Sequence, residues 1–163
     1  MLRLKPLLAL TALIAGLALG AAILSESVLG LVPCALCLWE RWPYRLLIGF
    51  GALGAFWPAG QKPMAALAMM AALAGGGLGV THIGVEQGWW PSPLPECAAP
   101  QLGHGSIADR LARMPARPAK PCDEPTFLIP GVPVSMAALN ALLALALAAG
   151  LATSIASKEQ IHE

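Results

Sequence analysis

Residues 7–24 have the sequence LLALTALIAGLALGAAIL, which contains no charged side chain. A transmembrane helix needs roughly 20 apolar residues, so this stretch is just long enough to cross a bilayer. Because lipid offers no partner to backbone N–H and C=O groups, a crossing segment must be helical. The stretch therefore predicts a transmembrane helix close to the N-terminus.

Three more apolar stretches follow along the chain. Hydrophobic residues make up 57% of the sequence and charged residues only 12%, about half of the roughly 25% typical of soluble domains. We expect an all-α integral membrane protein, a four-transmembrane-helix bundle that forms a single domain over residues 1–163. The four predicted helices span about 7–24, 40–59, 64–81 and 133–156.

The first apolar stretch also fits a second interpretation. Arg3 and Lys5 precede it, and small residues at 20–22 follow, as in a secretory signal peptide. Cleavage there would leave the later cysteine-bearing loops on one side of the membrane all the same.

The four cysteines fall in two of the predicted loops. Cys34 and Cys37 lie in the loop at about 25–39, and Cys97 and Cys122 lie in the long loop at about 82–132. With an even number of helices, both loops face the same compartment. Disulfides persist in oxidising compartments such as the bacterial periplasm, so we expect both loops outside and both termini in the cytoplasm.

The first cysteine pair precedes the second predicted helix. Pro43 fits only the first turn of a helix, which predicts a start near Trp39 or Glu40. The C-x-x-C then lies over a helix N-terminus, and Arg41 adds a positive charge nearby. Both features favour a thiolate, the reactive form of cysteine. A thiolate at the membrane surface is well placed to meet a lipid-soluble electron acceptor.

Other interpretations of the cysteines remain open. C-x-x-C can be half of a zinc site that His82 and His104 would complete, although a strong zinc signature needs a second close pair. The long-loop pair, Cys97 and Cys122, could form a purely structural disulfide. We predict no metal ligands in this chain.

Two further segments carry structural predictions. Residues 106–114 are expected to form a short helix, which either lies flat on the membrane or is an ordinary solvated helix of the loop. Glycines in the third predicted helix indicate close packing between helices, at Gly75, Gly76, Gly77 and Gly79.

The stretch from Pro33 to Tyr44, PCALCLWERWPY, closely resembles the signature of the bacterial disulfide bond formation protein B family, DsbB. The resemblance extends to Pro-Ser-Pro at 91–93, to Cys-Asp-Glu at 122–124 and to the four-helix layout, and so covers nearly the whole chain. It implies a multi-pass protein of the bacterial inner membrane.

The resemblance also implies an activity, that of a quinone-dependent protein-disulfide oxidoreductase. A reduced periplasmic oxidoreductase of the DsbA type would attack Cys97 in a Cys97–Cys122 disulfide. Cys122 would then exchange with the Cys34–Cys37 disulfide, at Cys34. Cys37 would meet a quinone from the membrane pool, ubiquinone or menaquinone. Oxidoreductases of the DsbA type are themselves strong oxidants, with a reduction potential of about −120 mV. Electrons therefore flow from them only to an acceptor such as a quinone pool.

Further cofactor contacts follow from the same resemblance. Arg41 would polarise the quinone ring oxygen. His82 resembles a family histidine near the quinone and would deliver a proton, or else is an interfacial polar residue. Arg45 either assists the quinone or extends outward to the lipid headgroups. The segment at 125–131 is shorter than in the family and lacks tryptophan. We interpret Glu40 as the partner of a nearby arginine.

Three alternative interpretations assign the chain to another family or another kind of membrane protein. The vitamin K epoxide reductase family also couples loop cysteines, a C-x-x-C and a quinone, but its C-x-x-C belongs to a late helix. A non-catalytic membrane protein with two static disulfides and a metal carrier are the remaining alternatives. A net charge of +1 without a dense basic run indicates no nucleic-acid partner.

Overall fold

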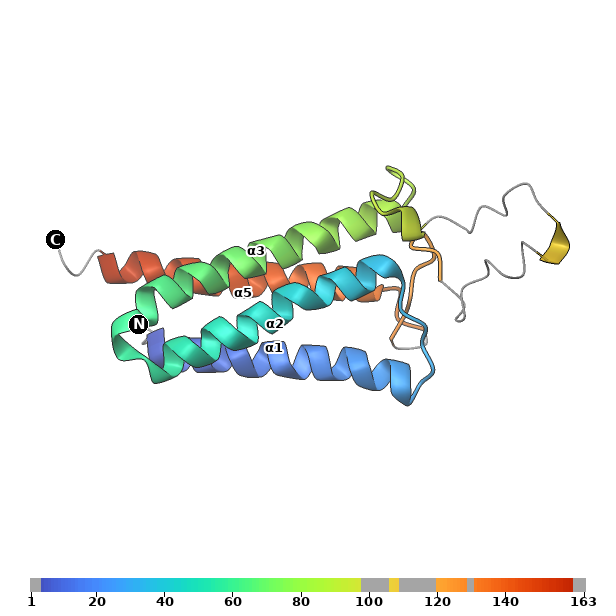
Figure 1. Ribbon diagram of the computed structural model, residues 1–163. Coiled ribbons are helices and arrows are strands. Elements are labelled where there is room, and N and C mark those ends of the chain that lie inside the picture. The colour runs from blue at the N-terminus through green and yellow to red at the C-terminus, as the bar shows by residue number, and fades with distance from the viewer. Residues whose placement is uncertain (1–3, 98–105, 109–119, 129–130, 160–163) are drawn as a thin grey trace.

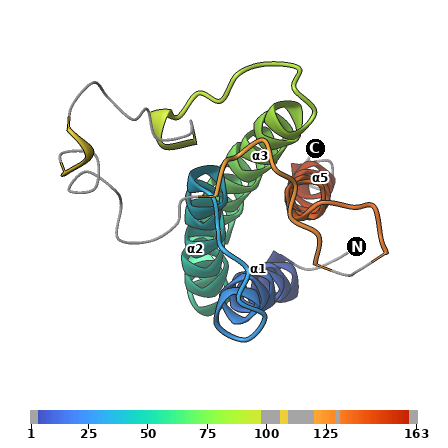
Figure 2. The ribbon, with the colours of Figure 1, turned by 90° about the vertical axis from the view of Figure 1, so that its right-hand side faces the viewer.

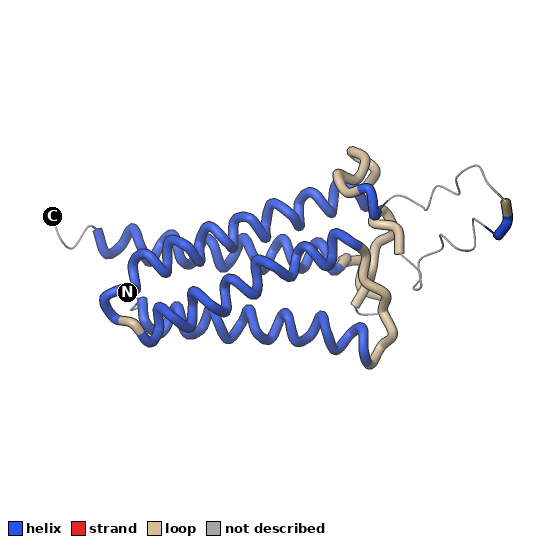
Figure 3. The backbone as a smooth tube through the Cα atoms, in the orientation of Figure 1, coloured by secondary structure: helices blue, strands red, loops and turns tan. Residues whose placement is uncertain are grey.

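The computed structural model describes residues 4–97, 106–108, 120–128 and 131–159. Within these ranges the chain is helical, with isolated bridges and no extended strand (Figures 1 and 3). This confirms the predicted all-helical class. The long helices are α1 (Leu4–Ser27), α2 (Ala35–Phe56), α3 (Gln61–Glu86) and α5 (Met136–Glu159), and two short 3-10 turns are η1 (Pro58–Gly60) and η2 (Pro95–Cys97).

Three segments are long and apolar enough to cross a membrane, at Leu4–Ser27, Pro58–Glu86 and Met136–Ala156. The protein is therefore a membrane protein. Helix α2 differs from these segments because its N-terminal half carries three charged residues, at Glu40, Arg41 and Arg45. These charges gather at one end of the bundle, where the cysteines also lie.

Helix α2 begins at Ala35, about five residues before the predicted start. The Cys34 side chain caps it by accepting a hydrogen bond from the Cys37 N–H at 3.2 Å, so Cys37 lies inside the helix. Pro43 is an interior residue, where membrane helices tolerate proline better than soluble ones. Gly75 of α3 leaves room for it, since a Cβ at Gly75 would stand 3.1 Å from the Pro43 Cβ.

The helices pack in a chain of neighbours. Helix α2 packs against α1 and α3, and α3 packs against α5, whereas α1 meets α5 at only a few points (Figure 2). The predicted close packing is confirmed at Gly79, where an added Cβ would lie 2.9 Å from the Ala141 backbone, and at Gly75 and Gly76. It is wrong for Gly77, which faces open space.

Both cysteine-bearing segments lie at one end of the bundle, opposite the ends where α1 begins and α5 stops (Figure 1). The two segments are joined by a parallel backbone bridge between Cys34 and Lys120. The predicted helix at 106–114 falls largely on residues 109–119, outside the described residues.

Candidate active site

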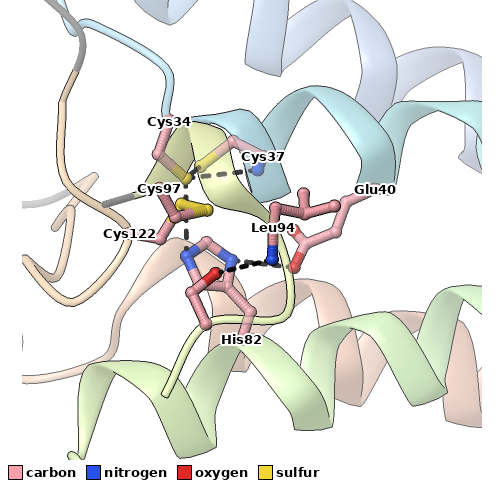
Figure 4. The surroundings of a disulfide bond; sticks show 8 residues. Cys34, Cys37, Glu40, His82, Leu94, Cys97 and Cys122 are labelled. Atoms are coloured by element: carbon pink, nitrogen blue, oxygen red, sulfur yellow. Dashed lines mark hydrogen bonds and ion pairs between the residues drawn. A yellow bond between two sulfur atoms is a disulfide. The ribbon is translucent and has the colours of Figure 1, made fainter. Parts of the chain in front are cut away.

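The four cysteines lie in one cluster at this end of the bundle. Cys34, Cys97 and Cys122 are buried together, and the partly buried Cys37 packs against them. Apolar neighbours complete the cluster, namely Ala35, Leu36, Val85 and Leu94. The structure thus brings together the two pairs that the sequence placed in separate loops (Figure 4).

Cys97 and Cys122 form a disulfide with an S–S length of 2.03 Å across 25 residues of sequence. Cys97 ends the η2 turn, and its N–H donates to the Leu94 carbonyl at 3.1 Å. Cys122 follows two residues after Lys120, whose backbone pairs with that of Cys34. The backbone bridge therefore holds the loop disulfide beside the start of α2.

Cys34 and Cys37 are free thiols, and their sulfur atoms lie 2.7 Å apart. A disulfide bond measures about 2.05 Å, so only a small movement separates the dithiol from the disulfide. The hydrogen bond with the Cys37 side chain holds the pKa of the Cys34 thiol below its ordinary value, while burial acts in the opposite direction. Cys34 is therefore disposed to be the thiolate of this pair.

His82 contacts this pair from α3. Its Nε2 lies 3.5 Å from the Cys34 Sγ, and its Nδ1 lies 2.9 Å from the Glu40 Oε1 (Figure 4). His82 is 3% exposed and Glu40 is 8% exposed. The sequence interpretation of Glu40 as the partner of an arginine is wrong, because its described ion pair is with His82.

A cavity of about 230 Å³ opens on the other side of the Cys34–Cys37 pair. Helices α1, α2 and α5 line it where α1 and α5 stand apart, and its wall is mostly apolar. Polar groups in its wall come from α1, α2, α5 and the segment after Cys122: Ser25, Glu26, Cys37, Glu40, Arg41, Tyr44, Thr126 and Asn140. The cavity can therefore hold an apolar ring with a few polar contacts at its edge.

Arg41 reaches the cavity wall and pairs with Glu26 at the end of α1. Its guanidinium makes two contacts with this carboxylate, one of them from Nη1 to Oε2 at 3.3 Å. The Nε–H is buried and has no hydrogen-bond partner among the described residues. Arg41 can therefore offer a fixed positive charge and a free donor to a ligand in the cavity.

The other predicted cofactor residues occupy different positions. Arg45 is exposed, and its guanidinium carbon lies 4.8 Å from the centre of the Trp42 ring, a cation–π contact outside the cavity wall. His82 lies behind the cysteine pair and is not part of that wall. The segment after Cys122 does contribute to it, through Thr126 and Leu128.

A metal ion could also find donors here. Cys34, Cys37 and His82 each offer one ligand atom, and these atoms lie within 4.8 Å of one another. A structural zinc site uses four such ligands, one more than this group supplies among the described residues.

Sequence reasoning missed two residues of the site. Glu26 precedes Cys34 by eight residues and Asn140 lies far beyond Cys122. Both reach the cavity only through the packing of α1 and α5. The one available signal was that each is a polar residue in or beside an otherwise apolar helix.

The chain was compared with known proteins. The sequence profile of the family described as "Disulfide bond formation protein DsbB" matches residues 4–154. No curated protein and no solved structure is similar enough to count as a match. The profile covers the helices, both cysteine pairs and the cavity. The chain therefore belongs to the DsbB family, whose members are membrane proteins of disulfide bond formation.

Proposed function

We propose that this protein is a membrane thiol oxidase that reoxidises a periplasmic DsbA-type dithiol oxidoreductase and passes the electrons to a membrane quinone. In this proposal the protein crosses the bacterial inner membrane four times. Its termini are cytoplasmic, and the end of the bundle with the cysteines faces the periplasm.

The position of the Cys34–Cys37 pair carries the proposal. Cys34 packs against the Cys97–Cys122 disulfide, and Cys37 lines the cavity between α1, α2 and α5. The pair therefore stands between a disulfide that can exchange with another protein and a cavity that opens among membrane helices. A static disulfide would need neither neighbour.

The exchange between proteins starts at the loop disulfide. A thiolate of the partner attacks the Cys97 sulfur, and Cys122 leaves as a thiolate. Cys122 then attacks the Cys34 sulfur of the oxidised Cys34–Cys37 pair, which frees Cys37 as a thiolate on the cavity wall. The second thiolate of the partner then releases Cys97, and Cys97 attacks Cys122 to free Cys34. Each exchange forms one S–S bond and breaks another. Over the four exchanges, two electrons and two protons pass from the partner dithiol to the Cys34–Cys37 pair.

The residues of the cavity fit a quinone. Its wall is mostly apolar, and the buried Arg41 Nε–H has no partner among the described residues. A bound quinone would accept two electrons and two protons, and would leave as quinol. Arg41 would donate to a ring oxygen and stabilise the negative charge that develops there, while Glu26 keeps the guanidinium in place. We keep ubiquinone and menaquinone as the two candidate acceptors.

The proposal is tested with purified protein in detergent, a reduced DsbA-type oxidoreductase and ubiquinone, by following quinone absorbance. The wild type is run beside Cys37→Ser and Cys97→Ser. Quinone loss that requires both cysteines would support the relay. If the wild type consumes no quinone and its cysteines stay bridged in the presence of the partner, the proposal fails, and a non-catalytic protein with static disulfides becomes the better account.

A metal site is the second candidate function, and the Cys34, Cys37 and His82 donors favour it. Metal analysis of the protein as purified, before any reductant or chelator is added, separates the two candidates. A stoichiometric ion that His82→Asn removes would support metal binding, and metal-free protein with quinone activity would exclude it.

A further inference from the structure

A continuous line of buried polar contacts runs from Cys34 through His82 to Glu40. The contacts are Cys34 Sγ to His82 Nε2 at 3.5 Å and His82 Nδ1 to Glu40 Oε1 at 2.9 Å (Figure 4). Both residues, His82 and Glu40, are more than nine-tenths buried. Burying an ionisable pair carries a desolvation penalty that a pair of apolar residues would not have, so packing alone does not account for it.

The order of these groups is that of an activated nucleophile. A thiol, a histidine within reach of it and a carboxylate that orients the histidine form the arrangement used to generate a thiolate. With Nδ1–H donating to Glu40, the free Nε2 faces Cys34 and can take the thiol proton. The imidazolium that results is stabilised by the Glu40 carboxylate.

Glu40 also belongs to the wall of the cavity, alongside Cys37 and Arg41. The line of contacts therefore begins at Cys34, which does not line the cavity, and ends at Glu40, in the wall of the cavity proposed for the quinone. His82 itself is not part of that wall, so a proton taken from Cys34 reaches the cavity through Glu40.

We infer that His82 and Glu40 are a proton-transfer pair that takes the proton of Cys34 and delivers it to the quinone cavity. The inference rests on the proposed function. When Cys34 and Cys37 close their disulfide, two S–H bonds break, one S–S bond forms, and two electrons and two protons are released. The quinone takes up both electrons. One proton arrives from Cys34 through His82 and Glu40, and the other comes from Cys37, which lines the cavity itself.

Several other groups face this pair and set its response to pH. Cys37 and Tyr44 face it from α2, and Glu86 faces it from α3. Helix α5 contributes Asn140, which does not titrate. Glu86 accepts a hydrogen bond from the Ser135 hydroxyl at 2.6 Å and forms no hydrogen bond with His82, so it provides a carboxylate control.

The experiment separates proton transfer from thiol exchange. His82→Asn, Glu40→Gln, Glu40→Asp and Glu86→Gln are each reduced and mixed rapidly with ubiquinone, and quinone loss is followed across pH. In parallel, each variant with its Cys97–Cys122 disulfide intact is mixed with a reduced DsbA-type partner. A normal rate of mixed-disulfide formation at Cys97 shows that the variant is folded.

We expect His82→Asn and Glu40→Gln to slow quinone reduction roughly 100-fold or more at neutral pH, the lower part of the range for lost acid–base catalysis. Their rates should rise with pH, because hydroxide then removes the Cys34 proton. Glu40→Asp keeps a carboxylate and should recover much of the rate. Glu86→Gln removes a charge that faces the pair but no hydrogen bond to His82, so it should keep most of the wild-type rate at neutral pH and only shift the pH profile.

A readout without quinone tests the same pair. In reduced protein, iodoacetamide should alkylate Cys34 more slowly at neutral pH in His82→Asn than in the wild type, as followed by mass spectrometry. If the His82 and Glu40 variants reduce quinone at the wild-type rate with an unchanged pH profile, the inference is overturned while the proposed function stands. If the wild type itself reduces no quinone, the proposed function has failed.

Discussion

The two cysteine pairs share one cluster but differ in bonding and in surroundings. Cys97 and Cys122 are joined in a disulfide across 25 residues and pack among apolar side chains. Cys34 and Cys37 are three residues apart, free, and in contact with His82 and the cavity. The difference is the one that the proposed relay requires, in which the loop pair would exchange with proteins and the helix pair would pass protons and electrons to the quinone.

Separating the two pairs should have the largest effect. Cys122→Ser removes the thiolate that passes electrons from the loop to Cys34, so quinone loss driven by a reduced DsbA-type partner should fall to background. A small dithiol that reduces the Cys34–Cys37 pair directly should still drive quinone loss in this variant, and should fail in Cys37→Ala. Partner-driven quinone loss at the wild-type rate in Cys122→Ser would show that the pairs do not act in series.

Removing the Arg41 charge from the cavity wall should weaken quinone binding beside the Cys34–Cys37 pair and leave exchange at the Cys97–Cys122 pair unchanged. Arg41→Met loses a charged hydrogen bond worth about 1.5–3 kcal/mol, so the KM for quinone should rise roughly ten- to a hundred-fold. Steady-state quinone titration measures this, with Lys62→Met as a charge control in a different part of the bundle. Because Arg45 stacks on Trp42 outside the cavity wall, Arg45→Met should have a smaller effect than Arg41→Met. Equal effects would contradict the placement of the quinone beside Arg41.

The support of the loop pair can be disturbed by itself. A Cβ at Gly84 would lie 1.9 Å from the Trp90 indole, on the segment that leads from α3 to Cys97. Gly84→Ala should therefore lower the free energy of unfolding by about 1–3 kcal/mol through overpacking. Thermal denaturation in detergent tests this beside Gly77→Ala, which faces open space and should be neutral or stabilising. Equal stability of the two variants would show that Trp90 moves aside freely.

The smallest expected effect is the shift in the pKa of the Cys34 thiol. Its folded pKa is lowered chiefly by the hydrogen bond with Cys37, so the thiolate forms at lower pH than for an ordinary cysteine. The pH midpoint of Cys34 alkylation in the reduced protein should therefore lie below that of a cysteine in an unfolded peptide, and Cys37→Ala should raise it. A midpoint that is unchanged by Cys37→Ala would assign the effect to another neighbour.

The long helices were predictable because uncharged apolar stretches such as 7–24 must be helical in lipid. The residues at which these helices begin and end were less predictable. The start of α2 was placed near Glu40 from Pro43 alone, since neither a thiol cap at Cys34 nor the room left by Gly75 is visible in a local pattern.

The part of the site that consists of short sequence motifs was predictable. The C-x-x-C and Arg41 identified one half of it. The contact of His82 with Glu40 spans 42 residues of sequence, and that of Arg41 with Glu26 joins two helices. Such pairs depend on how the helices rotate and pack against each other, which spacing along the chain does not determine.

The composition of the cavity wall has a consequence for biosynthesis. The wall takes residues from the first helix, α1, and from the last, α5, including Asn140. A ribosome must therefore finish nearly the whole chain before this compartment exists. Before that point, a nascent polypeptide has the Cys34 and Cys37 thiols but no enclosed cavity beside them. If the cavity holds the quinone, as proposed, quinone reduction would begin only after insertion of the final helix, and truncated translation products would be inert toward quinone.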